Sequence, residues 1–110
     1  MSARIIIAAV LSFAFVHGAA AGGKAEAGKA KAEKVCAACH GADGAKPSGP
    51  DQPILAGQYY DYLVKALSDY KSGKRNNAIM KAFATQLSRQ DMEDLAAWFS
   101  TQKSSLHFQR

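Results

Sequence analysis

The sequence predicts a small all-α domain wrapped around a large bound group, and three observations carry this prediction. Apolar residues recur with helical spacing in separate stretches of the chain. No stretch shows the apolar–polar alternation of a half-buried strand. The segments between the helical stretches are long for a chain of 110 residues, and long loops in so small a domain need something to fold around.

The first residues have the pattern of a secretory signal. Arg4 is positively charged, residues 5–16 form a run of 12 that is almost wholly apolar, and Ala19–Ala21 offers small side chains to a signal peptidase. A membrane span needs roughly 20 apolar residues, so this run is too short for one. We therefore expect residues 1–21 to be a cleavable signal peptide, with a periplasmic domain over residues 22–110 and no membrane span after cleavage.

The charge of the chain is mildly basic, with 14 Lys and Arg against 9 Asp and Glu and a formal net charge of +5. An excess of this size suits docking to an acidic face of another protein. The basic residues are dispersed and no DNA-binding motif accompanies them, so nucleic acid is not expected as a partner.

The first half of the domain is predicted as a short helix, a loop and a longer helix. Residues 24–35 are rich in Ala, Lys and Glu and favour a helix that leads into the cysteines. Residues 41–57 hold all three prolines of the chain and predict a loop. A helix is expected from Gln58 to Gly73, where glycine favours an end. Its apolar face comprises Tyr59, Tyr62, Leu63, Ala66, Leu67 and Tyr70.

The second half ends in the clearest helix of the sequence. Residues 74–77 are polar and break the helical pattern, and residues 79–87 are ambiguous because their apolar spacing is helical but the stretch is short. Ser88, with Asp91 three residues later, predicts a capping box at the start of the last helix. The apolar face of that helix is formed by Met92, Leu95, Ala96 and Phe99.

The chemistry is concentrated in Cys36-Ala37-Ala38-Cys39-His40, a C-x-x-C-H run of the kind that attaches c-type haem. Cysteines three apart on a helical turn point to the same side, so each sulfur can bond one vinyl group of a haem. His40 follows directly and can turn its imidazole onto the iron. The sequence therefore predicts one covalent haem c, with its iron, as the cofactor.

Other uses of the two cysteines are a plain disulfide, a thioredoxin-like redox pair or a zinc site. The redox pair belongs after a strand in a βαβ context, which this sequence lacks. Zinc needs further ligands, and the other two histidines lie in the predicted signal, at His17, and alone in the tail, at His107. Haem is the interpretation that we favour.

A second axial ligand for the iron has three candidates in the domain. Met92 belongs to the apolar face of the last helix, and His107 lies in a polar tail. Met80 follows the polar break in a weakly patterned stretch, where it is also explained as a core residue beside Phe83. Spacing alone gives Met80 only a small lead, and a thioether opposite a histidine would stabilise ferrous iron.

Taken in order, the motifs resemble those of a class I cytochrome c, in particular the small bacterial c4/c553-like group. The resemblance covers nearly all of residues 22–110. It is carried by residues 27–30, the haem motif with its continuation to Gly44, Pro53-Ile-Leu-Ala-Gly-Gln58, Asn77-Ala-Ile-Met80 and residues 87–99. The c4 proteins themselves have two such domains, whereas this chain has one haem motif, so the two-haem arrangement is not expected here.

The resemblance implies a role for each of five residues. Cys36 and Cys39 would form thioethers to the haem, and His40 and Met80 would be the axial ligands of its iron. The carbonyl of Pro53 would accept a hydrogen bond from the second ring nitrogen of His40 and so fix the orientation of the ring. The family also implies that Gly28 lets the first helix cross the last one closely, near Leu95 and Trp98.

The resemblance further implies a soluble periplasmic electron carrier and not an enzyme. Redox proteins would be its partners. Independently of the resemblance, the basic residues Lys65, Lys71, Lys74, Arg75 and Lys81 cluster in the sequence around the proposed Met80 loop, and we expect some of them to form a basic docking face; an ordinary solvated surface explains them equally well. Alternatives are an electron-transfer haem subunit of a fixed periplasmic oxidoreductase complex, and a haem enzyme or gas sensor with an open sixth position. A haem-free disulfide protein is the remaining possibility.

Overall fold

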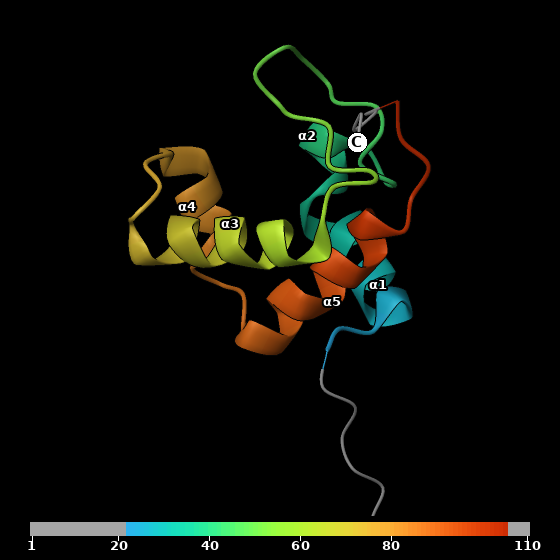
Figure 1. Ribbon diagram of the computed structural model, residues 1–110. Helices are drawn as coiled ribbons and strands as arrows, with labels where there is room; N and C mark the ends of the chain where they lie inside the picture. Colours follow the sequence, from blue (N-terminus) through green and yellow to red (C-terminus); the bar gives the residue numbers. More distant parts are fainter. Residues whose placement is uncertain (1–21, 106–110) are drawn as a thin grey trace, which may run out of the picture.

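The computed structural model describes residues 22–105, which are helical and contain no strand in that range (Figure 1). The all-α prediction is therefore confirmed. The expected signal peptide, residues 1–21, and His107 lie outside the described residues. The helices are α1 (Ala25–Val35), α2 (Ala37–His40), α3 (Tyr60–Ser72), α4 (Ala78–Ala84) and α5 (Arg89–Ser100).

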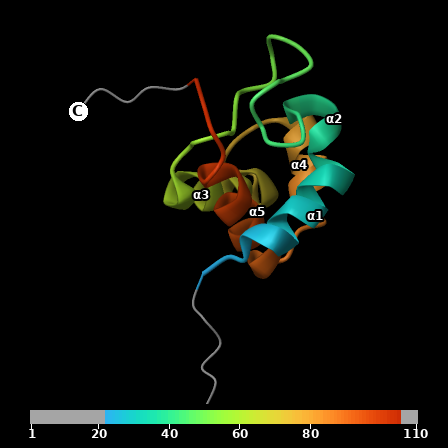
Figure 2. The same cartoon turned by 90° about the vertical axis from the view of Figure 1, so that its right-hand side faces the viewer.

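Three of the helices form the core of the domain. α5 crosses α1 on one side and packs along α3 on the other, as Figures 1 and 2 show from two directions. The expected apolar face of α5 is confirmed, because all four of its members are buried. The core cluster consists of Ala32, Leu63, Val64, Leu87, Met92, Leu95, Ala96 and Phe99.

The crossing of α1 and α5 is close because Gly28 has no side chain. A Cβ at this position would lie 1.9 Å from the carbonyl oxygen of Asp94 and 3.0 Å from the Cβ of Trp98. The indole Nε1 of Trp98, a residue of the same crossing, donates a hydrogen bond of 3.0 Å to the carbonyl oxygen of Ala42. This hydrogen bond joins the segment that follows α2 to the last helix.

The helix ends agree with the local signals in the sequence. Ser88 and Asp91 form the expected capping box, and the hydrogen bond from the Ser88 backbone lowers the pKa of Asp91. α3 ends at Gly73, which adopts a left-handed conformation with φ of 85° that favours glycine. The ambiguous stretch is helical from Ala78 to Ala84, and the side chain of Asn77 caps it.

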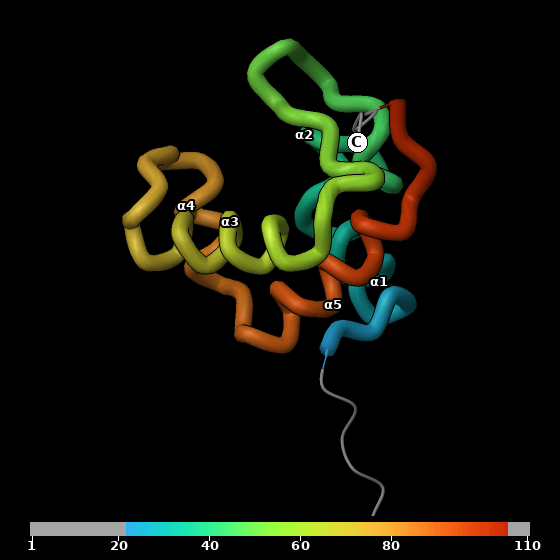
Figure 3. Tube along the Cα trace, viewed as in Figure 1, coloured from blue at the N-terminus to red at the C-terminus, as the bar shows by residue number. Residues whose placement is uncertain are grey.

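The segment between α2 and α3 is a loop, as predicted, and Figure 3 shows it rising from α2 and returning to the start of α3. Its beginning is held to α2, since the backbone N–H of Ser48 donates to the carbonyl of Cys39 at 2.9 Å. Its end is held to α5, where Gly57 donates to Phe99 at 2.9 Å. Leu55 also donates to Gly44 at 2.8 Å, which closes the loop on itself.

Candidate functional site

A cavity of about 580 Å³ lies between α2, the loop after it, α3, α4 and α5. This volume falls within the range of small-molecule and cofactor sites, roughly 300–1,000 Å³. Its walls are largely hydrocarbon, and the apolar side chains that line it are Val35, Ile54, Leu55, Leu63, Ala66, Leu67, Ile79, Phe83, Leu87, Leu95, Ala96 and Phe99.

The five residues singled out from the sequence all line this one cavity. Cys36, Cys39 and His40 come from the junction of α1 and α2, Pro53 from the loop, and Met80 from the first turn of α4. Residues from three separate segments of the chain thus face a common apolar space.

His40 is buried at the end of α2 and is held by the loop. Its Nδ1 lies 2.9 Å from the carbonyl oxygen of Pro53. A carbonyl oxygen can only accept, so Nδ1 carries the proton and donates it. The lone pair of the neutral ring is then on Nε2, which is the arrangement of a histidine prepared to bind a metal.

Cys36 and Cys39 are partly buried and are not bonded to each other. The backbone N–H groups of Cys39 and His40 both donate to the carbonyl of Cys36, at 3.2 and 3.0 Å, so the motif forms one helical turn. Burial, with a smaller contribution from Cys39, raises the pKa of Cys36 to about 11. Burial therefore disfavours the thiolate form of Cys36.

Two of the alternative uses of the cysteines find no support among residues 22–105. The reactive thiol of a thioredoxin-like pair has a lowered pKa, which is the opposite of the shift at Cys36. A zinc site needs several ligands together, and residues 22–105 contain no group of three His, Cys, Asp or Glu side chains that could hold a metal ion.

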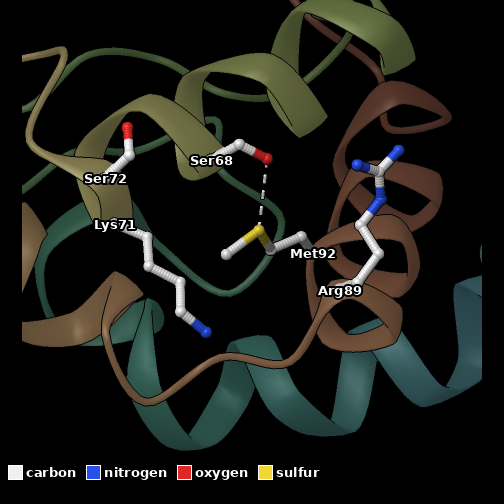
Figure 4. Close-up of a pocket in the computed structure, with 5 residues that line it drawn as sticks. All are labelled: Ser68, Lys71, Ser72, Arg89 and Met92. Carbon is white, nitrogen blue, oxygen red and sulfur yellow. Dashed lines mark hydrogen bonds between the residues drawn. The ribbon is translucent and has the colours of Figure 1, made fainter.

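The two methionines of the described chain lie in different places. Met80 is half-buried and lines the cavity. Met92 is only 3% exposed, does not line the cavity, and packs between α5 and α3. In Figure 4 the hydroxyl of Ser68 on α3 points to the sulfur of Met92, to which it donates at 3.5 Å.

Some residues of the cavity wall were not assigned to a site from the sequence. The apolar pattern of α3 identified Tyr62 and Tyr70 but gave no sign that they face a cavity. Arg75 was considered only as part of a basic surface, whereas its guanidinium lies 4.8 Å from the ring centre of Tyr70 and lines the cavity. No signal in the sequence distinguishes Arg75 from its neighbour Lys74 in this respect.

Comparison with known proteins places these features in context. Residues 25–103 match the family model described as cytochrome c. Cytochrome c4 of Pseudomonas aeruginosa is 46% identical over 103 residues, which cover 94% of this chain and 50% of that protein. The thiosulfate dehydrogenase electron acceptor of Stutzerimonas stutzeri is 42% identical over 66 residues, which cover 60% of this chain and 31% of that protein.

A solved structure agrees with the sequence comparison. The crystal structure of reduced recombinant cytochrome c4 from Pseudomonas stutzeri superposes with a TM-score of 0.69 and 44% identity, covering 76% of this chain and 48% of that one. The chain thus spans about half the length of the cytochrome c4 proteins that it matches. Among residues 22–105, no helix has both the length and the apolar character needed to cross a membrane.

Proposed function

We propose that this chain, which belongs to the cytochrome c family, is a carrier of single electrons. Membership of the family also implies that its cofactor is one covalently bound haem c with its iron. The fold is the all-α class I cytochrome c fold. The cytochrome c4 relatives are electron carriers and not enzymes, which supports the same role here. The observation that carries the proposal is the meeting of Cys36, Cys39, His40 and Met80 in one apolar cavity.

The residues of the cavity fit the attachment of this cofactor. The thiols of Cys36 and Cys39 lie on one helical turn and would form the two thioether bonds. The Nε2 of His40 would bind the iron, because Nδ1 is engaged by the carbonyl of Pro53 at 2.9 Å. That hydrogen bond would fix the plane of the imidazole and raise its basicity as a ligand.

Met80 would supply the second axial ligand, since it is the methionine that lines the cavity in the described chain. When bound, the cofactor supplies an iron centre that takes up or releases one electron. A thioether favours the ferrous state. If His40 and Met80 both held the iron, they would leave no open position for a substrate or gas, which favours a carrier over an enzyme or sensor.

Optical spectra of the oxidised and reduced protein, with and without carbon monoxide, test this proposal. We expect a low-spin oxidised form with a weak methionine-sulfur band toward the red, and no rapid binding of carbon monoxide to the reduced form. A high-spin spectrum with rapid carbon monoxide binding would instead indicate an open sixth position. A colourless sample, matured in the periplasm and with the mass of the bare polypeptide, would refute the assignment of haem.

We also propose that the domain of residues 22–110 works in the periplasm after removal of residues 1–21. The apolar run, the small residues at positions 19–21 and the C-x-x-C-H motif in the same chain support this location. Mass spectrometry of the protein from a periplasmic extract tests it. The mature chain should begin at Gly22, and retention of the first 21 residues would contradict the proposal.

We propose that redox proteins are the partners of this carrier and that they dock on a basic face beside α4. Lys74 and Lys81 are exposed there, and a Cβ at Gly73, the neighbour of Lys74, would lie 3.6 Å from the Nζ of Lys81. Lys65 and Lys71 contribute less, because Lys65 pairs with Asp69 and Lys71 donates to the carbonyl of Leu87. The partner would therefore offer carboxylates to this face.

Charge reversal tests this basic face. Lys74→Glu with Lys81→Glu should slow electron transfer to an acidic redox protein and weaken its dependence on ionic strength, because rim charges steer association. Lys34→Glu with Lys103→Glu is a control with the same change of net charge, since both lysines are exposed and neither lines the cavity. Equal rates and equal salt dependence for both variants would refute the proposal.

A further inference from the structure

The segment that carries Met80 is attached to the rest of the domain by few buried contacts. Residues 71–79 are all exposed, and Ala84 is the one buried residue of α4. Segments with few buried contacts open more easily than the core. Contacts that hold this segment against α3 therefore decide how firmly Met80 is kept in the cavity.

Arg75 makes three such contacts, all of them to α3. Its Nη1 donates to the hydroxyl of Tyr62 at 3.3 Å, and its guanidinium lies over the ring of Tyr70 with 4.8 Å to the ring centre. Its backbone N–H donates to the carbonyl of Asp69 at 3.1 Å. Among the described residues, Arg75 is also the one Lys or Arg side chain that lines the cavity.

Arg75 lies only five residues before Met80, so its contacts with α3 also restrict the position of Met80. Asn77 lies between them, and its Oδ1 accepts a hydrogen bond of 3.0 Å from the backbone N–H of Met80. α4 therefore begins in a fixed relation to the segment that Arg75 holds. Loss of the side-chain contacts at Arg75 would therefore loosen residues 73–77 and, with them, the first turn of α4.

We propose that Arg75 is a positioning residue, which holds the Met80 segment against Tyr62 and Tyr70 and so sets how readily Met80 gives up its place to another ligand. This inference rests on the proposed ligation by His40 and Met80. An added ligand binds the iron only in the fraction of molecules from which Met80 has moved away, so its apparent affinity reports that fraction.

The experiment is a titration of the oxidised, haem-loaded protein with imidazole, followed by loss of the methionine-sulfur band. We expect Arg75→Gln to raise the apparent affinity for imidazole about tenfold, because it removes a hydrogen bond from a charged donor and a cation–π contact. Tyr62→Phe removes the hydrogen bond alone and should raise it about threefold. Lys74→Gln makes the same change of charge at the exposed neighbouring position and should leave the affinity within twofold of the wild type.

A second pair of variants separates positioning from a general effect on the haem. In a Met80→Ala background the sulfur is gone, so adding Arg75→Gln should change the affinity for imidazole by less than twofold. An effect of equal size with and without Met80 would overturn the inference, as would an Arg75→Gln protein that titrates like the wild type. If Arg75→Gln does not fold, Tyr62→Phe decides in the same way.

The two proposals fail in different ways. A wild-type protein without the methionine-sulfur band would contradict ligation by Met80. A wild-type protein with the band, in which neither Arg75→Gln nor Tyr62→Phe changes imidazole binding, would leave that ligation intact and refute the role of Arg75. A reduction potential that shifts in Arg75→Gln without any change in imidazole binding would assign Arg75 an electrostatic effect on the cofactor and would also refute it.

Discussion

Replacement of Gly28 by alanine tests the packing that holds the domain together. Alanine is the better helix former by about 1 kcal/mol, so helix propensity predicts a more stable protein. The structure predicts the opposite, because the new Cβ would lie 1.9 Å from the carbonyl oxygen of Asp94. The atom that it meets belongs to the backbone of α5 and cannot rotate away.

The size of the effect follows from the distance. Ordinary contact of a Cβ begins at 3.4 Å, so α1 and α5 would have to separate by about 1.5 Å at this point. A gap of that size removes much of the dispersion energy between the two helices, and overpacking of this kind costs about 3 kcal/mol. After the gain in propensity, Gly28→Ala should lose about 2 kcal/mol of unfolding free energy and about 8–16 °C in Tm.

Urea and thermal unfolding of the haem-loaded protein, followed by circular dichroism, measure this loss. Ala30→Gly is the matched control, because Ala30 is exposed in the same helix and reports propensity without the crossing. It should lose about 1 kcal/mol. A Gly28→Ala protein that is as stable as the wild type, or more stable, would refute the close crossing.

Three further predictions follow from the same structure. Met92→Ala should lose about 2–5 kcal/mol of unfolding free energy but keep the methionine-sulfur band in the optical spectrum. Met80→Ala should lose the band. If Met92→Ala loses the band and Met80→Ala keeps it, Met80 is not the ligand. Asp91→Asn should lower the free energy of unfolding at pH 7, because a carboxylate whose pKa is lowered in the folded protein stabilises it while ionised. The difference in stability between the two proteins should vanish as the pH falls below 3.8, and a difference independent of pH would contradict this cause. Trp98→Phe removes the hydrogen bond to Ala42 and should cost about 1 kcal/mol in urea unfolding, and no change would show that the bond does not stabilise the loop.

The parts of the fold that could be predicted are those with local causes. The start of α5 depends on Ser88 and Asp91, and the end of α3 depends on Gly73, all of which act within one helical turn. α4 has a local cap at Asn77 but only seven residues, too few to be stable alone. Its existence depends on the packing of Ala84 and Leu87, which the sequence does not display.

The candidate site likewise has residues that the sequence predicts from local spacing and residues that depend on the tertiary fold. Cys36, Cys39 and His40 are adjacent in the sequence, so their chemistry could be predicted from their spacing. Composition did not separate Met80 from Met92, spacing gave Met80 only a small lead, and the family resemblance then favoured Met80. The structure shows why: whether a methionine faces the cavity depends on how α4 and α5 pack against α3, which is a property of the tertiary fold.

The apolar residues of α3 are of two kinds, those that pack in the protein core and those that line the cavity. Val64 belongs to the protein core and does not line the cavity, whereas Tyr62, Ala66 and Tyr70 line the cavity and lie outside the core cluster. α3 is therefore apolar over a wider arc than its protein neighbours cover. In a domain this small, such an excess of apolar helix surface indicates that part of the core is supplied by something other than the chain. A helix of this kind therefore indicates a large bound group without reference to the cysteines, as the long loops also do.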